Sequence, residues 1–203
     1  MKTLYVNGCS HTAGSECNTN YANIIGQKLN YKVINKATPG GGNHKIYRET
    51  MEYLCNDNHP VDFVIIGWTT HERFEFSFDG ENTDYTLYKE SYNKELEKFY
   101  RYADLHMADW DLGLQNTITY QLGLQTFLES KNIDYRYINM FNHIPEDCQI
   151  PMWKNINQSK YILPHSSFIE TLLEQYPNMF SSTKHATDPV IHEKISEAII
   201  KEM

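Results

Sequence analysis

The chain has 203 residues, of which 40% are apolar and 22% charged, and both values are ordinary for one soluble domain. Its formal net charge of -8 makes a nucleic-acid backbone an unfavourable partner, because like charges repel. No segment approaches the run of about 18 apolar residues that a membrane span needs.

The four cysteines, at positions 9, 17, 55 and 148, show neither CxxC spacing nor the density of a disulfide framework. We interpret them as free thiols of a reducing compartment. The apolar run within residues 1–12 is too short for a signal peptide. These features predict a cytoplasmic protein.

Four short runs of β-branched and aromatic residues predict buried strands over 3–7, 31–35, 62–67 and 134–138. Amphipathic stretches predict helices over 21–29, 44–54, 114–128 and about 189–201. Strands that alternate with helices predict a three-layer α/β/α sandwich around a short parallel sheet of about five strands, as in flavodoxin-like folds. We expect one domain over 1–203, with a helical insertion at about 74–111 that fits no strand and a loop-like segment over 144–163.

Residues 8–12 read Gly-Cys-Ser-His-Thr directly after the first predicted strand. A small residue before a serine at a strand-to-helix turn leaves the hydroxyl exposed at the sheet edge, where backbone N–H groups face an anion. Ser10 is therefore a candidate nucleophile. The alternative is that Ser10 only caps the helix. Cys9 is a rival nucleophile, but adjacent side chains diverge in such a turn.

A second loop, residues 37–44, reads Ala-Thr-Pro-Gly-Gly-Gly-Asn-His. Successive glycines let the backbone approach a ligand and turn its N–H groups inward. Such a loop can supply one oxyanion donor, and the side-chain amide of Asn43 another. The alternative is a tight turn with Asn43 as the helix N-cap. The loop lacks the glycine spacing of nucleotide sites.

Near the C-terminus, two histidines flank one carboxylate, as His185, Asp188 and His192. A base that activates a serine needs an imidazole oriented by an acceptor. Asp188 follows His185 by three residues and precedes His192 by four, so it can pair with either. The alternative is that Asp188 caps the last helix, with Pro189 at its first position.

Together these motifs resemble the SGNH, or GDSL-like, hydrolase family, and especially its short phage-encoded members. The resemblance rests on four blocks in the family's order, which cover 5–14, 35–46, 65–76 and 185–187. It implies that Ser10 is the nucleophile and an oxyanion donor, that Gly40 is the second donor and that His185 is the base. It implies no cofactor.

Two departures from the family pattern stand out. Thr69 occupies the block-three position where the family usually has an asparagine donor, and Ser182 occupies the place of the acid three residues before His185. Either Asp188 substitutes from the other side, or the site is a Ser-His dyad, or it is inactive. Loss of one oxyanion donor costs about 100- to 1000-fold in rate.

The resemblance implies a serine ester hydrolase that removes a small acyl group, for example from a carbohydrate, through an acyl-enzyme. The alternative is a catalytically inactive SGNH-like protein that binds a glycan or serves as a phage structural or accessory component, with a virion or homo-oligomeric partner. No metal is expected, because HExxH and paired Cys/His spacings are absent. Arg73 either contacts the substrate or pairs with Glu75 on a solvated turn.

Overall fold

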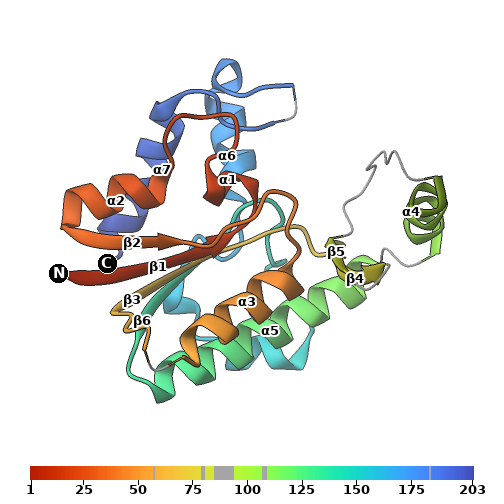
Figure 1. Ribbon diagram of the computed structural model, residues 1–203, viewed down its shortest axis with the longest axis horizontal. Coiled ribbons are helices and arrows are strands. Elements are labelled where there is room, and N and C mark those ends of the chain that lie inside the picture. Colours follow the sequence, from red (N-terminus) through yellow and green to blue (C-terminus); the bar gives the residue numbers. More distant parts are fainter. Residues whose placement is uncertain (57, 79–80, 85–93, 107–108, 183) are drawn as a thin grey trace.

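The protein is described by a computed structural model that covers residues 1–56, 58–78, 81–84, 94–106, 109–182 and 184–203. Its main sheet has five parallel strands in the order β2-β1-β3-β6-β7 (Figure 1). Their bounds are Lys2–Gly8 for β1, Tyr31–Asn35 for β2, Phe63–Trp68 for β3, Asp134–Asn139 for β6 and Tyr161–Ile162 for β7. The predicted short parallel sheet of about five strands is confirmed.

Helices cover both faces of this sheet, so the predicted three-layer arrangement is confirmed (Figure 1). One face carries α1 (Ser10–Ala13), α2 (Tyr21–Leu29), α6 (Phe168–Gln175) and α7 (Pro189–Lys201). The other face carries α3 (Asn43–Leu54) and α5 (Trp110–Ser130). Short 3-10 helices span Pro151–Asn155, Gln158–Lys160 and Pro177–Met179. None of the described helices is long and apolar enough to cross a membrane.

Alternate strand residues enter opposite cores. Leu4 and Val6 of β1 pack in the cluster under α2 and α7, whereas Tyr5 packs in the cluster under α3 and α5. Successive side chains of a strand point to opposite faces, and here both faces are covered. Every residue of β3 is therefore buried, which explains the continuous apolar runs in the sequence.

The segment predicted as a helical insertion at about 74–111 is only partly helical. It begins with an antiparallel pair, β4 (Glu75–Phe78) and β5 (Glu81–Asp84), and continues with α4 (Lys94–His106). Positions 79–80, 85–93 and 107–108 lie outside the described residues. The expectation that no strand fits here was wrong, since the Glu-Phe-Ser-Phe alternation of β4 has the two-residue period of a strand.

The carboxyl ends of the strands bring the sequence motifs to one edge. Gly8 of β1 pairs with Gly67 of β3, so Ser10 and Thr69, each two positions further on, follow neighbouring strands about 4.8 Å apart. A Cβ atom on Gly8 would lie 2.3 Å from Thr12 Oγ1, and one on Gly67 would lie 2.6 Å from it. The two glycines thus leave room for α1 to close over the sheet edge.

Candidate active site

Ser10 begins α1 immediately after β1. Cys9 is the extended N-cap residue of this helix and makes no side-chain cap bond, so the alternative interpretation of Ser10 as the cap is wrong. The thiol side chain of Cys9 is fully buried in the apolar core. Ser10 is 5% exposed. Cys9 therefore lies in the apolar core, whereas the neighbouring Ser10 keeps a small part of its surface exposed.

The glycine loop lies against the Ser10 turn. The Thr38 N–H donates to the Gly8 carbonyl over 3.1 Å, and Gly40 has φ of +80°, a conformation that favours glycine. Gly42, rather than Asn43, is the N-cap residue of α3, so the cap alternative for Asn43 was wrong. The loop that carries Gly40 is thus fastened to the end of β1.

The amide of Asn43 is buried and already bonded on both sides. Its Nδ2 donates to Thr117 Oγ1 over 2.9 Å and to the Thr69 carbonyl over 3.2 Å, and its Oδ1 accepts from the Thr69 N–H over 2.8 Å. Asn43 therefore braces the backbone of Thr69 against α5. To act as an oxyanion donor, it would have to exchange one of these bonds.

Thr69 is fully buried, and its Oγ1 accepts a bond of 3.0 Å from Arg73 Nη1. The guanidinium carbon of Arg73 lies 5.5 Å from the centre of the Phe141 ring. Arg73 therefore stands at the sheet edge beside the block-three threonine. The alternative that Arg73 pairs with Glu75 was wrong.

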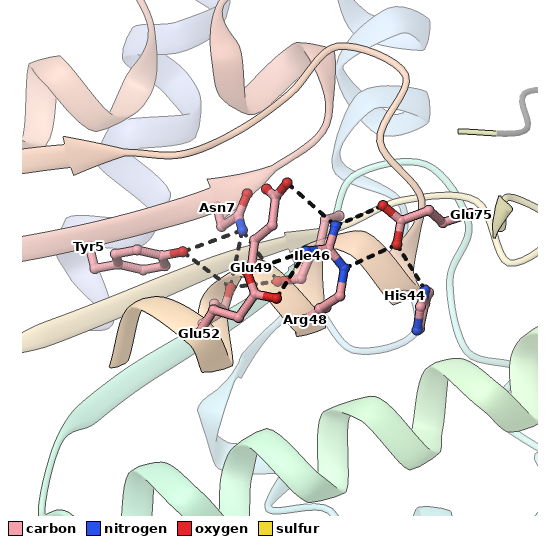
Figure 2. Close-up of polar contacts among 9 residues, drawn as sticks. Tyr5, Asn7, His44, Ile46, Arg48, Glu49, Glu52 and Glu75 are labelled. Atoms are coloured by element: carbon pink, nitrogen blue, oxygen red, sulfur yellow. Dashed lines mark hydrogen bonds and ion pairs between the residues drawn. The ribbon is translucent and has the colours of Figure 1, made fainter. Parts of the chain in front are cut away.

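Glu75 is bound instead from α3 (Figure 2). Arg48 donates from Nε and Nη2 over 3.1 and 2.7 Å, and His44 Nδ1 lies 3.3 Å from the carboxylate. Burial alone would raise the pKa of Glu75, but the bonds from Arg48 hold it below its ordinary value. The same helix accepts a bond from Asn7 of β1 at the Ile46 carbonyl. Helix α3 thus ties the end of β1 to the segment that carries Arg73.

His185, in the turn before α7, reaches the Ser10 turn on the face of the sheet that carries α1 and α7. It sits on a turn that an isolated bridge between Phe180 and Ala186 closes. Its ring stacks on that of His11, with centres 5.1 Å apart and planes at 24°. Its Nδ1 lies 3.2 Å from Glu16 Oε1. The structure therefore brings an imidazole and a carboxylate to the residue that follows Ser10.

Sequence reasoning missed Glu16. The residue lies in the loop after α1, with φ of +64°, and no motif marks it. Asp188 instead caps α7, where its Oδ1 accepts a bond of 2.9 Å from the Val190 N–H, so the cap interpretation of Asp188 is confirmed. The carboxylate placed against His185 is that of Glu16.

His11 and His192 are buried in the same region. Burial lowers the pKa of His11 to about 3, with smaller contributions from His185, His192 and Arg73, and it lowers the pKa of His192 to about 4. In the described part of the chain, neither ring has a hydrogen-bond partner. Both are therefore neutral at pH 7, and the His11 ring serves as an uncharged wall between His185 and Phe141, 4.8 Å from the latter.

No protein-family model matches the chain, and no curated protein sequence is significantly similar to it. Solved structures, in contrast, are similar along almost the whole chain. A protein of the G-D-S-L lipolytic family from Desulfitobacterium hafniense has a TM-score of 0.55 at 15% identity, with 100% of each chain covered.

Two further structures belong to esterases. The psychrotrophic esterase EstA from Pseudoalteromonas, in a form inhibited by monoethylphosphonate, has a TM-score of 0.56 at 11% identity over 99% of this chain and 98% of that one. The acetyl xylan esterase AlAXEase has a TM-score of 0.55 at 11% identity over 98% of each. At such identities the similarity shows the fold alone, an α/β fold that the chain shares with these lipolytic and esterase structures.

Proposed function

We propose that the protein is a serine ester hydrolase with Ser10 as nucleophile and His185 as general base. The observation that carries this proposal is the position of the His185 ring, stacked on the neighbour of Ser10 with its Nδ1 3.2 Å from Glu16. A carboxylate that accepts a hydrogen bond from Nδ1 fixes the tautomer in which Nε2 is the basic nitrogen. Glu16 is then the orienting acid, in place of the Asp188 expected from sequence.

In the proposed reaction, Nε2 of His185 removes the proton of Ser10 Oγ as that oxygen bonds to the ester carbonyl carbon. Glu16 stabilises the resulting imidazolium. Collapse of the tetrahedral intermediate breaks the bond to the alcohol oxygen, which takes the proton from Nε2. Water then attacks the acyl-enzyme by the same route, which releases the carboxylic acid and restores Ser10.

The proposed oxyanion donors are the backbone N–H groups of Ser10 and Gly40. The bond between Thr38 and Gly8, which fastens the glycine loop to the turn, supports this pairing. Thr69 and Asn43 have a supporting role in this proposal, because the two bonds from the Asn43 side chain fix the backbone position of Thr69. Each well-placed donor contributes about 100- to 1000-fold in rate.

A small acyl group, such as acetyl, is the proposed acyl part of the substrate. The slight exposure of Ser10, and the packing of the Phe141 ring on that of the neighbouring His11, favour a short acyl chain. The fold shared with an acetyl xylan esterase agrees with this choice.

One observation favours a second candidate, a binding protein without turnover. The amide of Asn43 already bonds to Thr69 and Thr117, and the hydroxyl of Thr69 already bonds to Arg73. The Asn43 side chain can therefore stabilise an oxyanion only by giving up a bond. Such a protein would use the same site to bind a glycan or a partner, including a virion component or a second copy.

The test is intact-mass measurement after treatment with a fluorophosphonate. A single adduct is expected on the wild type and on Cys9→Ser, and none on Ser10→Ala or His185→Ala. Glu16→Gln is expected to slow labelling at least tenfold, whereas Asp188→Asn tests the acid predicted from sequence and is expected to label at the wild-type rate. A folded wild type that takes no adduct would favour the binding protein.

A further inference from the structure

The guanidinium group of Arg73 lies at the carboxyl edge of the sheet with donors to spare. Its Nη1 donates to Thr69 Oγ1 over 3.0 Å, and in the part of the chain that the structure describes this is the one hydrogen bond of the group. The nearby carboxylate of Glu75 bonds to Arg48 instead (Figure 2). Because a guanidinium has five N–H donors and a permanent positive charge, Arg73 can bind a further oxygen atom.

The glycine loop packs directly on the backbone of Arg73. A Cβ atom on Gly42 would lie 3.0 Å from the Arg73 carbonyl oxygen and 3.2 Å from the Arg73 Cβ. The same loop carries Gly40, a proposed oxyanion donor, and the bond from Thr38 to Gly8 fastens it to the end of β1. Arg73 is therefore fixed beside the loop that supplies one of the proposed donors.

The end of β3 fixes the side chain of Arg73. Thr69, which accepts the bond from Arg73, directly follows β3, and the side chain of Asn43 holds its backbone. Since β3 pairs with β1, Thr69 and Ser10 follow neighbouring strands. The guanidinium is thus held at the edge from which Ser10 begins α1.

Phe141 connects the guanidinium with the residue next to Ser10. The guanidinium carbon of Arg73 lies 5.5 Å from the centre of the Phe141 ring, which is 4.8 Å from the centre of the His11 ring. Burial is the main cause that lowers the pKa of His11, and the positive charge of Arg73 contributes to the same effect. Because the interaction of two charges falls with distance, the guanidinium is within electrostatic reach of the nucleophile turn.

The cavity that Arg73 lines does not suit an anionic ligand. It has a volume of about 210 Å³, and its lining includes the carboxylates of Glu72 and Asp109. Of the two histidines in the lining, burial keeps His71 neutral by lowering its pKa to about 4, and His44 lies 3.3 Å from a carboxylate of β4. Two carboxylates repel a third anion, so recognition of an anionic substrate group in this cavity is disfavoured. The charge of Arg73 is better matched to negative charge that develops at the nucleophile turn.

We infer that Arg73 is a further catalytic residue of the proposed esterase and that its guanidinium stabilises the oxyanion of the tetrahedral intermediate. The negative charge forms when Ser10 Oγ bonds to the carbonyl carbon and the electron pair of the C=O double bond moves to the oxygen. It disappears when that double bond reforms and the bond to the alcohol oxygen breaks. A charged donor that is already held in place needs no reorganisation as this charge develops.

This inference rests on the proposed function and adds a third donor to the N–H groups of Ser10 and Gly40. The amide of Asn43 cannot fill this role while its donors bond to Thr69 and Thr117. Arg73 therefore supplies the charge stabilisation that the side chain of Asn43 does not provide.

The test is the hydrolysis of p-nitrophenyl acetate, a small neutral ester, by the wild type, Arg73→Met and Arg73→Lys. Arg73→Met removes the charge and the N–H donors, and it should lower kcat about 100-fold, the effect of one oxyanion donor. KM should change by less than about threefold, because the ground-state ester is neutral. Since an oxyanion forms in both acylation and deacylation, kcat falls whichever of the two steps is slower.

Two further variants serve as controls for charge. Arg73→Lys keeps a positive charge on a flexible chain and should recover at least about tenfold of the lost kcat. Arg101→Met removes the same charge at an exposed position on α4 and should keep the wild-type kcat. An equal loss in Arg73→Met and Arg73→Lys would overturn the inference.

Thr69→Val keeps the experiment decisive if circular dichroism shows that an Arg73 variant does not fold. This variant replaces the buried hydroxyl that holds the guanidinium by a methyl group and leaves the charge of Arg73 in the chain. It should lower kcat at least about tenfold through misplacement of the guanidinium, whereas Thr69→Ser, which keeps the hydroxyl, should stay near the wild type. Wild-type kcat in Thr69→Val or in folded Arg73→Met would overturn the inference.

A negatively charged ester, p-nitrophenyl hemisuccinate, distinguishes oxyanion stabilisation from substrate recognition. Arg73→Met should lower kcat for both esters by a similar factor. A rise of KM for the hemisuccinate, with unchanged kinetics for the acetate, would instead assign Arg73 to recognition of an anionic substrate and overturn the inference.

Labelling of Ser10 by the fluorophosphonate tests the proposed function separately. A phosphoryl oxygen gains negative charge as Ser10 bonds to phosphorus, so Arg73→Met should also be labelled at least about tenfold more slowly than the wild type. A labelled wild type with an Arg73→Met protein that reacts equally fast overturns only the role of Arg73. A folded wild type that takes no label and hydrolyses neither ester overturns the hydrolase, and the role of Arg73 with it.

Discussion

Acidification from pH 7.5 to 5.5 should destabilise the fold through His11, His71 and His192. All three are almost completely buried. Burial lowers the pKa of His11 to about 3, and those of His71 and His192 to about 4, from an ordinary value of 6.5. For His71, a bond to the His143 backbone opposes part of this effect. The three rings therefore stay neutral in the folded protein throughout this range.

The sign and size follow from proton linkage. At pH 5.5, an unfolded imidazole is about 90% protonated, while the folded rings remain neutral, so the unfolded state binds more protons and stability falls with pH. Each histidine then costs about 1.3 kcal/mol between pH 7.5 and 5.5, and the three together about 4 kcal/mol. The carboxyls of Glu75 and Asp134, with lowered pKa values, lose their contribution only below this range.

Urea unfolding at pH 7.5, 6.5 and 5.5, followed by circular dichroism, measures this loss directly. His192→Leu removes one of the three titrating groups, so its loss should be about 2.7 kcal/mol. At pH 7.5 this variant should be near neutral or stabilising, because it replaces a buried polar ring without a partner by an apolar side chain. A free energy of unfolding that is constant or rises toward pH 5.5 would refute the reasoning.

Three substitutions test other features of the structure. Gly67→Ala places a Cβ 2.6 Å from Thr12 Oγ1 and should cost about 1–3 kcal/mol by overpacking; an unchanged melting temperature would contradict this. Asp188→Ala should cost about 1 kcal/mol through loss of the α7 cap, while fluorophosphonate labelling stays at the wild-type rate; slowed labelling would return Asp188 to the reaction. Glu75→Gln should lower the free energy of unfolding in urea by about 1–2 kcal/mol. Glu52→Gln is the control, since its carboxylate is 63% exposed, and it should lower this free energy by less than about 0.5 kcal/mol. Equal losses would argue against a special role of the buried Glu75–Arg48 pair.

The sequence by itself determined the layered parallel fold. Strands buried on both faces must be apolar at every position, as β3 is, and such runs stand out between amphipathic helices. The cap at Asp188 followed by Pro189 is equally local, and α7 begins where it predicts. In contrast, β7 has two residues, which is too short for any period to show, and the β4–β5 pair was missed in a polar segment.

The polar pairs of the site were decided by the tertiary structure. His185 meets Glu16, far away along the chain, because a turn before α7 and the loop after α1 reach the same end of the sheet. Glu75 bonds to Arg48, although Arg73 is closer to Glu75 in the sequence, and Arg73 bonds to Thr69 instead. The residue pattern predicts burial and local conformation. The polar partners depend instead on strand register and helix packing, because these determine which loops meet at the same edge of the sheet.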